Sequence, residues 1–503
     1  MSITATRAEP GFHLPLALLG AVGVVIGAAS VGFPLFVVGG ILGLVYIVVA
    51  LQSLAAGVAL FTVLIFLERI PTVSSGVTST TKLAGGVLVL AWLLAVAKRD
   101  PNTPLFARRL PVLAYSTLVL LCWMLASMLW ATDSRTAGGT ALRFAQGVAL
   151  IFVVFSAVRE PRHLKWIVYA FLVGAALSAV VGLAGVTKAE DANIDASRLT
   201  GGIGDPNELA AVLVPALSFA LFMLVIERRV LLRWLLLAAA LISALALFRT
   251  ESRGGLVGLG VMLVASAFLS GPVRARAVTM ALATSGFALV YFTLIAPPQA
   301  LARVTTFSAG GGTGRPDLWA VALDVFRAHP LVGVGAGNFP LVEPSYAFLN
   351  RNLPRFDLIV VTPKVVHNTY LNVLVEVGVV GFILFAFVVV GAFAAALRAV
   401  RALARAGDLE VEILARGIIV GTIGMLAAFT FFSAQYQKQL PLLIALLAAL
   451  STVARTRSRN GGAAGAAQRG LQNALNSGAS PSDLETPNTS LRLLHGAGDR
   501  AGD

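Results

Sequence analysis

The stretch from Leu209 to Ile226 reads LAAVLVPALSFALFMLVI and carries no charge. An α-helix needs about 20 apolar residues to cross the ~30 Å hydrocarbon layer of a membrane, so this stretch predicts a membrane-spanning helix. Similar blocks of about 15–25 residues recur along the chain. About fourteen can be counted, beginning near Leu14, Phe33, Gln52, Leu83, Pro111, Thr140, Leu164, Leu209, Val230, Gly254, Ala277, Tyr370, Ile413 and Leu440.

The composition agrees with a membrane protein. Of the 503 residues, 57% are hydrophobic and 12% are charged, whereas soluble domains contain roughly 45–50% apolar residues. The sequence therefore predicts an all-α polytopic membrane protein with about 12–14 transmembrane helices. The single cysteine, Cys122, excludes an intramolecular disulfide.

The net charge of +14 reflects topology rather than nucleic-acid binding, because the basic residues do not gather in one domain. They occupy alternate breaks between the blocks, as cytoplasmic loops do under the positive-inside rule. We therefore expect a multi-pass protein of the bacterial inner membrane with both termini cytoplasmic. The basic groups are Lys98 to Arg109, Arg159 to Lys165, Arg228 to Arg233, Arg274 and Arg276, Arg398 to Arg405, and Arg455 to Arg459.

This orientation divides the chain into four parts. Residues 1–296 form the N-terminal transmembrane helices, residues 297–368 one long external loop, residues 369–455 the C-terminal helices, and residues 456–503 a disordered cytoplasmic tail. A connection as long as 297–368 is typically functional or disordered. Its apolar residues, such as Trp319 and Phe339, favour a small packed lid, with a helix over Asp317–Phe326.

Of the five histidines, His329 and His367 face outward in this topology. His329 precedes Pro330, which favours a structural turn. His367 directly precedes the span at Tyr370, with Asn368 or Thr369 as its N-cap. A base there would lie beside a helix N-terminus that favours anions. The alternative is a histidine that only caps the helix at the membrane surface.

Three external arginines form the second group. Arg198 opens a glycine-rich stretch that ends at Asp205-Pro206-Asn207, which resembles an N-cap followed by the first helical residues. Arg253 lies in Glu251-Ser252-Arg253-Gly254-Gly255, and Arg315 precedes Pro316-Asp317. Fixed guanidinium groups suit a pyrophosphate. Alternatively, each arginine anchors a span end or pairs with a nearby carboxylate.

Two polar groups fall inside predicted spans. Glu376 follows Asn368 and Asn372 at helical spacing, and an intramembrane carboxylate is a functional candidate by default. An interhelical hydrogen bond is the other interpretation. Arg143 with Gln146 poses the same choice near the outer end of its span.

These segments together resemble the O-antigen ligase and polymerase family with its Wzy-type domain. The residues that carry the resemblance are Gly314 to Trp319, His329 to Phe339, His367 to Leu371, Glu376 to Gly378 and Gly381-Phe382, with Arg198 to Asn207 and Ser252 to Gly255 as further matches. The related region runs from about 198 to 385.

The resemblance implies a helical glycosyltransferase of GT-C-like architecture that moves a glycan from an undecaprenyl-pyrophosphate donor to a lipid, glycan or protein acceptor, with membrane lipids around it. It also implies inverting chemistry with no metal and no cofactor. His367 takes the role of the base that deprotonates the acceptor hydroxyl. Arg198, Arg253 and Arg315 take the pyrophosphate, and Asn207, Asn368 and Glu376 support the site.

Two other functions remain open. A polymerase of the same superfamily would add repeat units to another lipid-linked glycan, which the residues do not distinguish from a ligase. A transporter or flippase would be polytopic too, but its ionisable groups gather near the bilayer midplane. Here most of the distinctive polar groups sit at the external ends of the spans.

Overall fold

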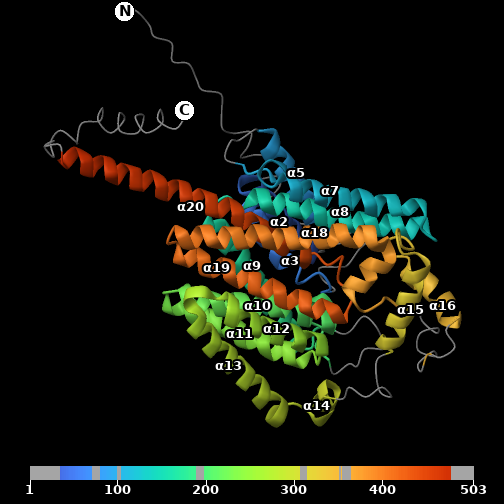
Figure 1. The fold of residues 1–503 in the computed structure, drawn as a ribbon. Coiled ribbons are helices and arrows are strands. Elements are labelled where there is room, and N and C mark those ends of the chain that lie inside the picture. The colour runs from blue at the N-terminus through green and yellow to red at the C-terminus, as the bar shows by residue number, and fades with distance from the viewer. Residues whose placement is uncertain are drawn as a thin grey trace, which may run out of the picture.

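A computed structural model describes residues 34–70, 80–98, 103–187, 198–305, 314–349, 353 and 364–476. All regular elements in these ranges are helical (Figure 1). The helices are α2 (Pro34–Gln52), α3 (Leu54–Leu64), α5 (Thr80–Ala97), α6 (Phe106–Arg109), α7 (Pro111–Ala126), α8 (Ser134–Ala157), α9 (Pro161–Leu183), α10 (Pro206–Ile226), α11 (Val230–Arg249), α12 (Arg253–Leu269), α13 (Arg274–Val290), α14 (Pro298–Thr305), α15 (Arg315–Ala328), α16 (Phe339–Leu349), α18 (Thr369–Arg405), α19 (Leu409–Ala428) and α20 (Gln439–Asn476).

The prediction of a polytopic helical membrane protein is confirmed. Within the described ranges, 10 helices are long and apolar enough to cross a membrane, and α2, α3 and α12 contain shorter apolar stretches. Every predicted block from Phe33 onward coincides with one of these helices. The first block, from Leu14, lies outside the described residues. The short block near Gln52 is α3, which has 11 residues and starts at the capping side chain of Ser53.

Consecutive spans run in alternating directions, which separates the two ends of the bundle (Figure 1). One end, called the basic end here, carries the described arginines and lysines of the α5–α7, α8–α9, α10–α11, α12–α13 and α18–α19 connections. The opposite end, called the cap end, carries α15 and α16. The basic connections that the positive-inside rule assigns to the cytoplasm therefore lie at one end of the bundle.

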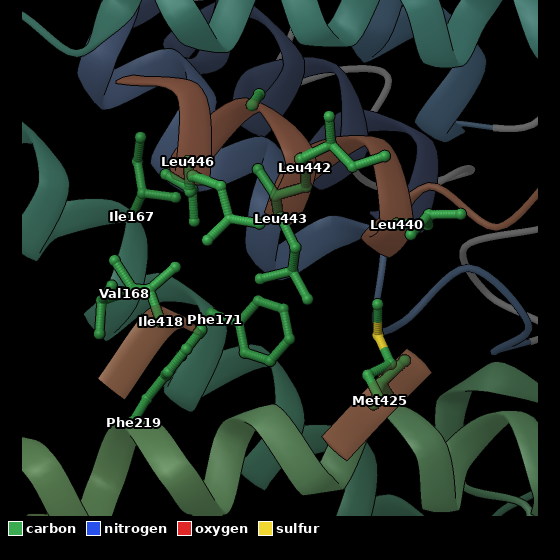
Figure 2. Packing of buried hydrophobic residues seen from close by; sticks show 14 of the residues in the cluster. Ile167, Val168, Phe171, Phe219, Ile418, Met425, Leu440, Leu442, Leu443 and Leu446 are labelled. Carbon is green, nitrogen blue, oxygen red and sulfur yellow. The ribbon is translucent and has the colours of Figure 1, made fainter. Parts of the chain in front are cut away.

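The interior of the bundle is centred on α10, α19 and α20, whose residues are mostly buried. Phe171 of α9, Phe219 of α10, Ile418 of α19 and Leu443 of α20 point toward one another there (Figure 2). In a membrane, close packing rather than water exclusion holds such helices together, and small residues allow close approach. A Cβ on Gly258 of α12 would come within 2.6 Å of the Gly424 carbonyl oxygen of α19.

The long connection after α13 is largely helical. The expected helix over Asp317–Phe326 is present as α15, and α14 and α16 flank it. Residues 306–313, 350–352 and 354–363 of this connection lie outside the described ranges. Leu318, Val321 and Phe339 form a second apolar core with Val375 of α18. This core packs residues 314–349 against the start of α18, and we call these residues the cap segment.

Helix α20 continues past residue 456, where the predicted tail starts, and ends at Asn476. It projects from the basic end of the bundle in Figure 1. Its many alanines favour helix. The rest of the tail, residues 477–503, lies outside the described residues.

Helix α18 is broken near its start, and the cap segment fills the break. Gly378 has φ 69° and ψ −176°, so the regular helical hydrogen bonds fail around it. Four backbone hydrogen bonds to the loop between α15 and α16 replace them: Val379 N to Pro330 O at 2.9 Å, Val380 N to Leu331 O at 3.4 Å, Val334 N to Val375 O at 3.1 Å, and Gly335 N to Glu376 O at 2.8 Å. Non-helical backbone at membrane depth is tolerated only where protein satisfies it in this way.

Helices α7 and α8 hold this junction from the other side. The Trp123 indole donates to the Val377 carbonyl at 2.9 Å, and the Trp130 indole donates to the Val332 carbonyl at 3.1 Å. The buried Asn338 side chain accepts from Asp133 N at 2.7 Å and donates to the Asp133 carbonyl at 3.2 Å. The sequence motif from His329 to Phe339 in the cap segment and the motif from Glu376 to Gly378 in α18 thus meet in one structural joint.

Candidate functional site

The start of α10 positions Arg198. Asp205 caps the helix by accepting from Asn207 N at 2.7 Å and Glu208 N at 3.0 Å, which confirms the predicted Asp205-Pro206 helix start. The Arg198 guanidinium donates to the Asn207 amide oxygen at 3.1 Å and to the Thr250 carbonyl at 2.9 Å. Both acceptors are neutral and orient the guanidinium.

The start of α12 lies beside this group. Ser252 is the N-cap of α12, accepting from Gly255 N at 3.2 Å, and its hydroxyl donates to the same Asn207 oxygen at 2.9 Å. Asn207 therefore joins α10 to α12. The next residue, Arg253, is the first of α12 and is half-buried.

Arg315 is the third cation of the site and the first residue of α15. Its pKa is lowered to about 10, mainly by burial and further by the nearby charges of Arg253 and Arg198, while Asp205 opposes the shift. Guanidinium groups affect one another in this way only when their charges lie close together. The arginines predicted to bind phosphate thus converge, and we call Arg198, Arg253 and Arg315 the arginine cluster.

His367 stands at the start of α18, where Asn368 is the N-cap and accepts from Tyr370 N and Leu371 N at 3.0 Å. The Trp319 indole donates to the Val366 carbonyl at 3.1 Å, next to His367. Trp319 follows Arg315 by one turn of α15, and side chains four residues apart share a helix face. Helix α15 therefore connects the arginine cluster with the segment that carries His367.

A second connection runs through the short turn after α19. The Thr369 hydroxyl donates to the Phe432 carbonyl at 2.8 Å. A Cβ on Gly254, the residue after Arg253, would come within 2.8 Å of the Phe431 Cβ. Gly254, the residue after Arg253, and Thr369, two residues after His367, therefore both pack against the turn at Phe431 and Phe432.

The backbone is strained at two points of this site. Among the described residues, the non-glycine residues with positive φ are Glu251 at 51° and His367 at 55°. Each directly precedes an N-cap, Ser252 of α12 and Asn368 of α18. Such conformations cost about 1–3 kcal/mol and cluster at functional sites.

Four helices, α10, α12, α15 and α18, begin at this end of the bundle and bring their N-termini to the arginine cluster and His367. A helix N-terminus carries about half a positive charge, so each favours an anion. Helix α15 begins at Gly314 without a side-chain cap. Cations and helix N-termini together make a site for a strongly anionic group.

The contacts of Glu251 and the position of His329 bear on the alternative roles of the site residues. The Glu251 carboxylate pairs with Arg303 of α14 at 3.5 Å. His329 follows the far end of α15, about 21 Å along the helix from Arg315. It is exposed, with its Nε2 3.2 Å from the Tyr346 hydroxyl. His367, rather than His329, is therefore the histidine that Trp319 connects to the start of α15, where Arg315 lies.

Glu376 lies in α18, nine residues after His367 and two residues before Gly378, where the helix is broken. It is 2% exposed, and the Tyr436 hydroxyl donates to its carboxylate at 2.8 Å. Asn372, between the two, accepts from the Ser433 hydroxyl at 3.2 Å. The polar stripe predicted on α18 thus faces the α19–α20 connection, and Glu376 makes the interhelical hydrogen bond that was its alternative role.

Several residues that shape this site were not predicted as site residues, although Ser252 and Trp319 lie in the motifs that carry the resemblance. Thr250 and Ser252 orient the Arg198–Asn207 pair, and Trp319 fixes the segment before His367. Each bond depends on chain segments 45 to 52 residues apart, with Trp319 and Val366 separated by 47. Among the described residues, no group of three or more His, Cys, Asp or Glu could hold a metal ion.

Comparison with known proteins shows a likeness to O-antigen ligases. A family model described as O-antigen ligase matches residues 238–386, which include Arg253, Arg315 and His367, whereas Arg198 and Asn207 precede the match. An O-antigen ligase of Pseudomonas aeruginosa is 29% identical over 296 residues. The match covers 58% of this chain and 65% of that protein's own length. Residues 238–386 therefore resemble the O-antigen ligase family, and the many membrane-spanning helices and the cap segment are features that accompany this likeness.

Proposed function

We propose that this protein transfers a glycan from a polyprenyl-pyrophosphate donor, such as undecaprenyl pyrophosphate, to a hydroxyl of a lipid or glycan acceptor. The reaction takes place at the cap end, which we assign to the external face of the inner membrane. The observation that carries the proposal is the convergence of Arg198, Arg253 and Arg315 next to the segment of His367. A pyrophosphate is the group of this donor that three arginines would hold.

The chemistry follows from the charges. The neutral His367 imidazole accepts the proton of the acceptor hydroxyl, and the oxygen attacks the anomeric carbon. The bond from that carbon to the phosphate oxygen breaks on the opposite side, so the configuration inverts. The pyrophosphate leaves with the bonding electrons and gains negative charge. Arginines fixed around it stabilise the transition state more than the bound donor. This mechanism needs no metal.

The strain at His367 suggests a sharp test of the base. Asparagine tolerates positive φ better than alanine, so His367→Asn preserves the backbone while removing the base. We expect glycosyl transfer by the purified protein in vesicles to slow by roughly 10²–10⁴-fold. Binding of the donor should stay close to that of the parent. Transfer by this variant at the parent rate would refute the assigned base.

A second variant tests the pyrophosphate site. Arg315→Gln removes one charge from the arginine cluster, and we expect donor affinity to fall about tenfold or more. Arg327→Gln on the exposed face of the same helix is the matched control and should bind donor normally. Equal affinities for both variants would contradict the site.

The same vesicles separate the competing functions. A ligase attaches the glycan to a lipid acceptor, whereas a polymerase lengthens the lipid-linked glycan itself. Movement of donor across the membrane without a new glycosidic bond would instead indicate a transporter.

A further inference from the structure

A second cluster of polar groups lies away from the arginine cluster, between α7, α8, α18 and α20. These helices contact one another in a ring, in the order α7, α8, α20, α18. They surround a narrow, partly open cleft with a cavity volume of about 40 Å³. Most of the lining is apolar, with Leu120, Phe144 and Phe385 among its side chains. Arg143, Gln435, Tyr436 and Gln437 supply the polar part.

Arg143 occupies a distinctive position on α8. The ten residues up to it, SRTAGGTALR, are largely polar or small, whereas residues 144–157, FAQGVALIFVVFSA, are mostly apolar. This apolar part is about 21 Å long, so Arg143 marks the level where the outer border of the hydrocarbon layer begins. Its side chain is exposed. An arginine at this depth reaches toward lipid phosphates with its charged end while its stem lies among apolar groups.

The side-chain oxygens of Gln435 and Gln437 are a second, independent indication that a hydrogen-bonding partner is missing from the cleft. Gln435 is 7% exposed, and its side-chain oxygen, like that of Gln437, has no hydrogen-bond partner. Both residues line the cleft. A buried polar atom left without a partner costs about 1–3 kcal/mol, which a bound hydroxyl or amide donor would recover. The cleft therefore combines a cationic side chain, two amide side chains and an apolar lining.

These features match one kind of amphiphile. The single charge of Arg143 suits a phosphodiester with one negative charge, whereas the pyrophosphate of the donor calls for the arginine cluster. The amides suit hydroxyl groups beside the phosphate, and the apolar lining suits an acyl chain. Basic pockets between transmembrane helices bind anionic lipid head groups elsewhere.

We propose that this cleft binds an anionic glycerophospholipid of the surrounding bilayer, with its phosphate on Arg143, its head-group hydroxyls on Gln435 and Gln437, and one acyl chain along α8 and α18. Bound there, the lipid would lie against Tyr436, which donates to Glu376 next to the α18 break. The site is separate from the proposed transfer reaction and does not depend on it.

Native mass spectrometry of the detergent-purified full chain tests the proposal, with phosphatidylglycerol as the probe. We expect phosphatidylglycerol to bind at least about tenfold more tightly than phosphatidylethanolamine, whose head group is neutral overall. Arg143→Gln should weaken phosphatidylglycerol binding about tenfold, and Arg143→Lys should retain much of it. Arg135→Gln, an exposed arginine at the start of the same helix, is the matched control and should bind like the parent.

Other outcomes decide against the proposal. Equal binding by the parent and Arg143→Gln, or an equal loss in Arg135→Gln, would mean that Arg143 does not form a specific site. Tight binding of glycerol phosphate would indicate a phosphate site without a chain channel, and preference for polyprenyl phosphate would indicate the carrier lipid instead. If Arg143→Gln does not fold, Gln437→Ala in the half-buried connection serves, and it should weaken phosphatidylglycerol binding severalfold.

Discussion

Individual residues at the cap end are placed by contacts that their neighbours in sequence do not reveal. Sequence motifs alone predict Arg198, Arg253, Arg315 and His367 as members of the candidate site. Their convergence was not predictable, because it depends on how α10, α12, α15 and α18 bring their first turns together. The positive φ of His367 is likewise invisible in a sequence, since histidine rarely adopts that conformation.

Glu343 of α16 provides a prediction at this scale. Its side chain is fully buried, and neither carboxylate oxygen has a hydrogen-bond partner. Burial raises its pKa to about 7, although Lys364 opposes the shift. Because the folded-state pKa exceeds the ordinary 4.5, this group stabilises the fold fully below pH 4.5, and the stability is lost as the pH rises through about 7.

Glu343→Gln should therefore flatten the pH dependence of thermal unfolding in detergent between these values. At pH 8 the variant should be more stable than the parent by roughly 1–3 kcal/mol. Asp324→Asn removes a carboxylate that pairs with the exposed Arg327 and serves as the control, with little change expected. A parent-like pH profile for Glu343→Gln would show that this carboxyl is not held neutral by burial.

At the scale of elements, the sequence predicted the helices well and their breaks poorly. Block length and polarity located each span, because crossing a membrane requires a long apolar stretch. The break of α18 at Gly378 was not predicted, although Glu376-Val377-Gly378 was noted as part of a motif. A glycine within an apolar block has many uses. Its role here appears only through the carbonyl of Leu331, which belongs to the cap segment.

Gly378→Ala tests that joint. A Cβ on Gly378 would lie 2.1 Å from the Leu331 oxygen, and φ 69° disfavours any side chain. We expect a loss of roughly 2–4 kcal/mol in thermal unfolding and faster proteolysis of the cap segment. Gly260→Ala of α12, where nothing lies within 4 Å of the added Cβ, should be neutral or slightly stabilising. Similar stabilities for both variants would argue against a tight joint.

At the scale of the whole molecule, charge and hydropathy predicted which connections share an end of the bundle. The described basic residues of the α5–α7, α8–α9, α10–α11, α12–α13 and α18–α19 connections lie together at the basic end, and the arginine cluster lies at the other. The depth of the cap segment was not predictable, because its packing on the α7–α8 turn joins parts of the chain more than 200 residues apart.

Cysteine labelling tests the assigned orientation. In a Cys122→Ser background, Arg327→Cys on the exposed face of α15 should react with a membrane-impermeant maleimide added to intact cells or spheroplasts. Arg109→Cys at the basic end should react after lysis alone, because cytoplasmic loops carry the positive charge. The reverse pattern would place the arginine cluster in the cytoplasm and remove the basis for external transfer.

The tryptophans beneath the cap segment also set an order of assembly during synthesis. Trp123 donates to a carbonyl 254 residues further along the chain, and Trp130 donates to one 202 residues further along. Neither hydrogen bond can form until those later residues have been synthesised. At translation rates of about 5–20 residues per second, the first interval lasts roughly 13–50 s. Until α18 emerges, the end of α7 must rest against lipid or a membrane chaperone. The candidate site is therefore among the last parts of the protein to form, so a nascent chain cannot act before its C-terminal third is inserted.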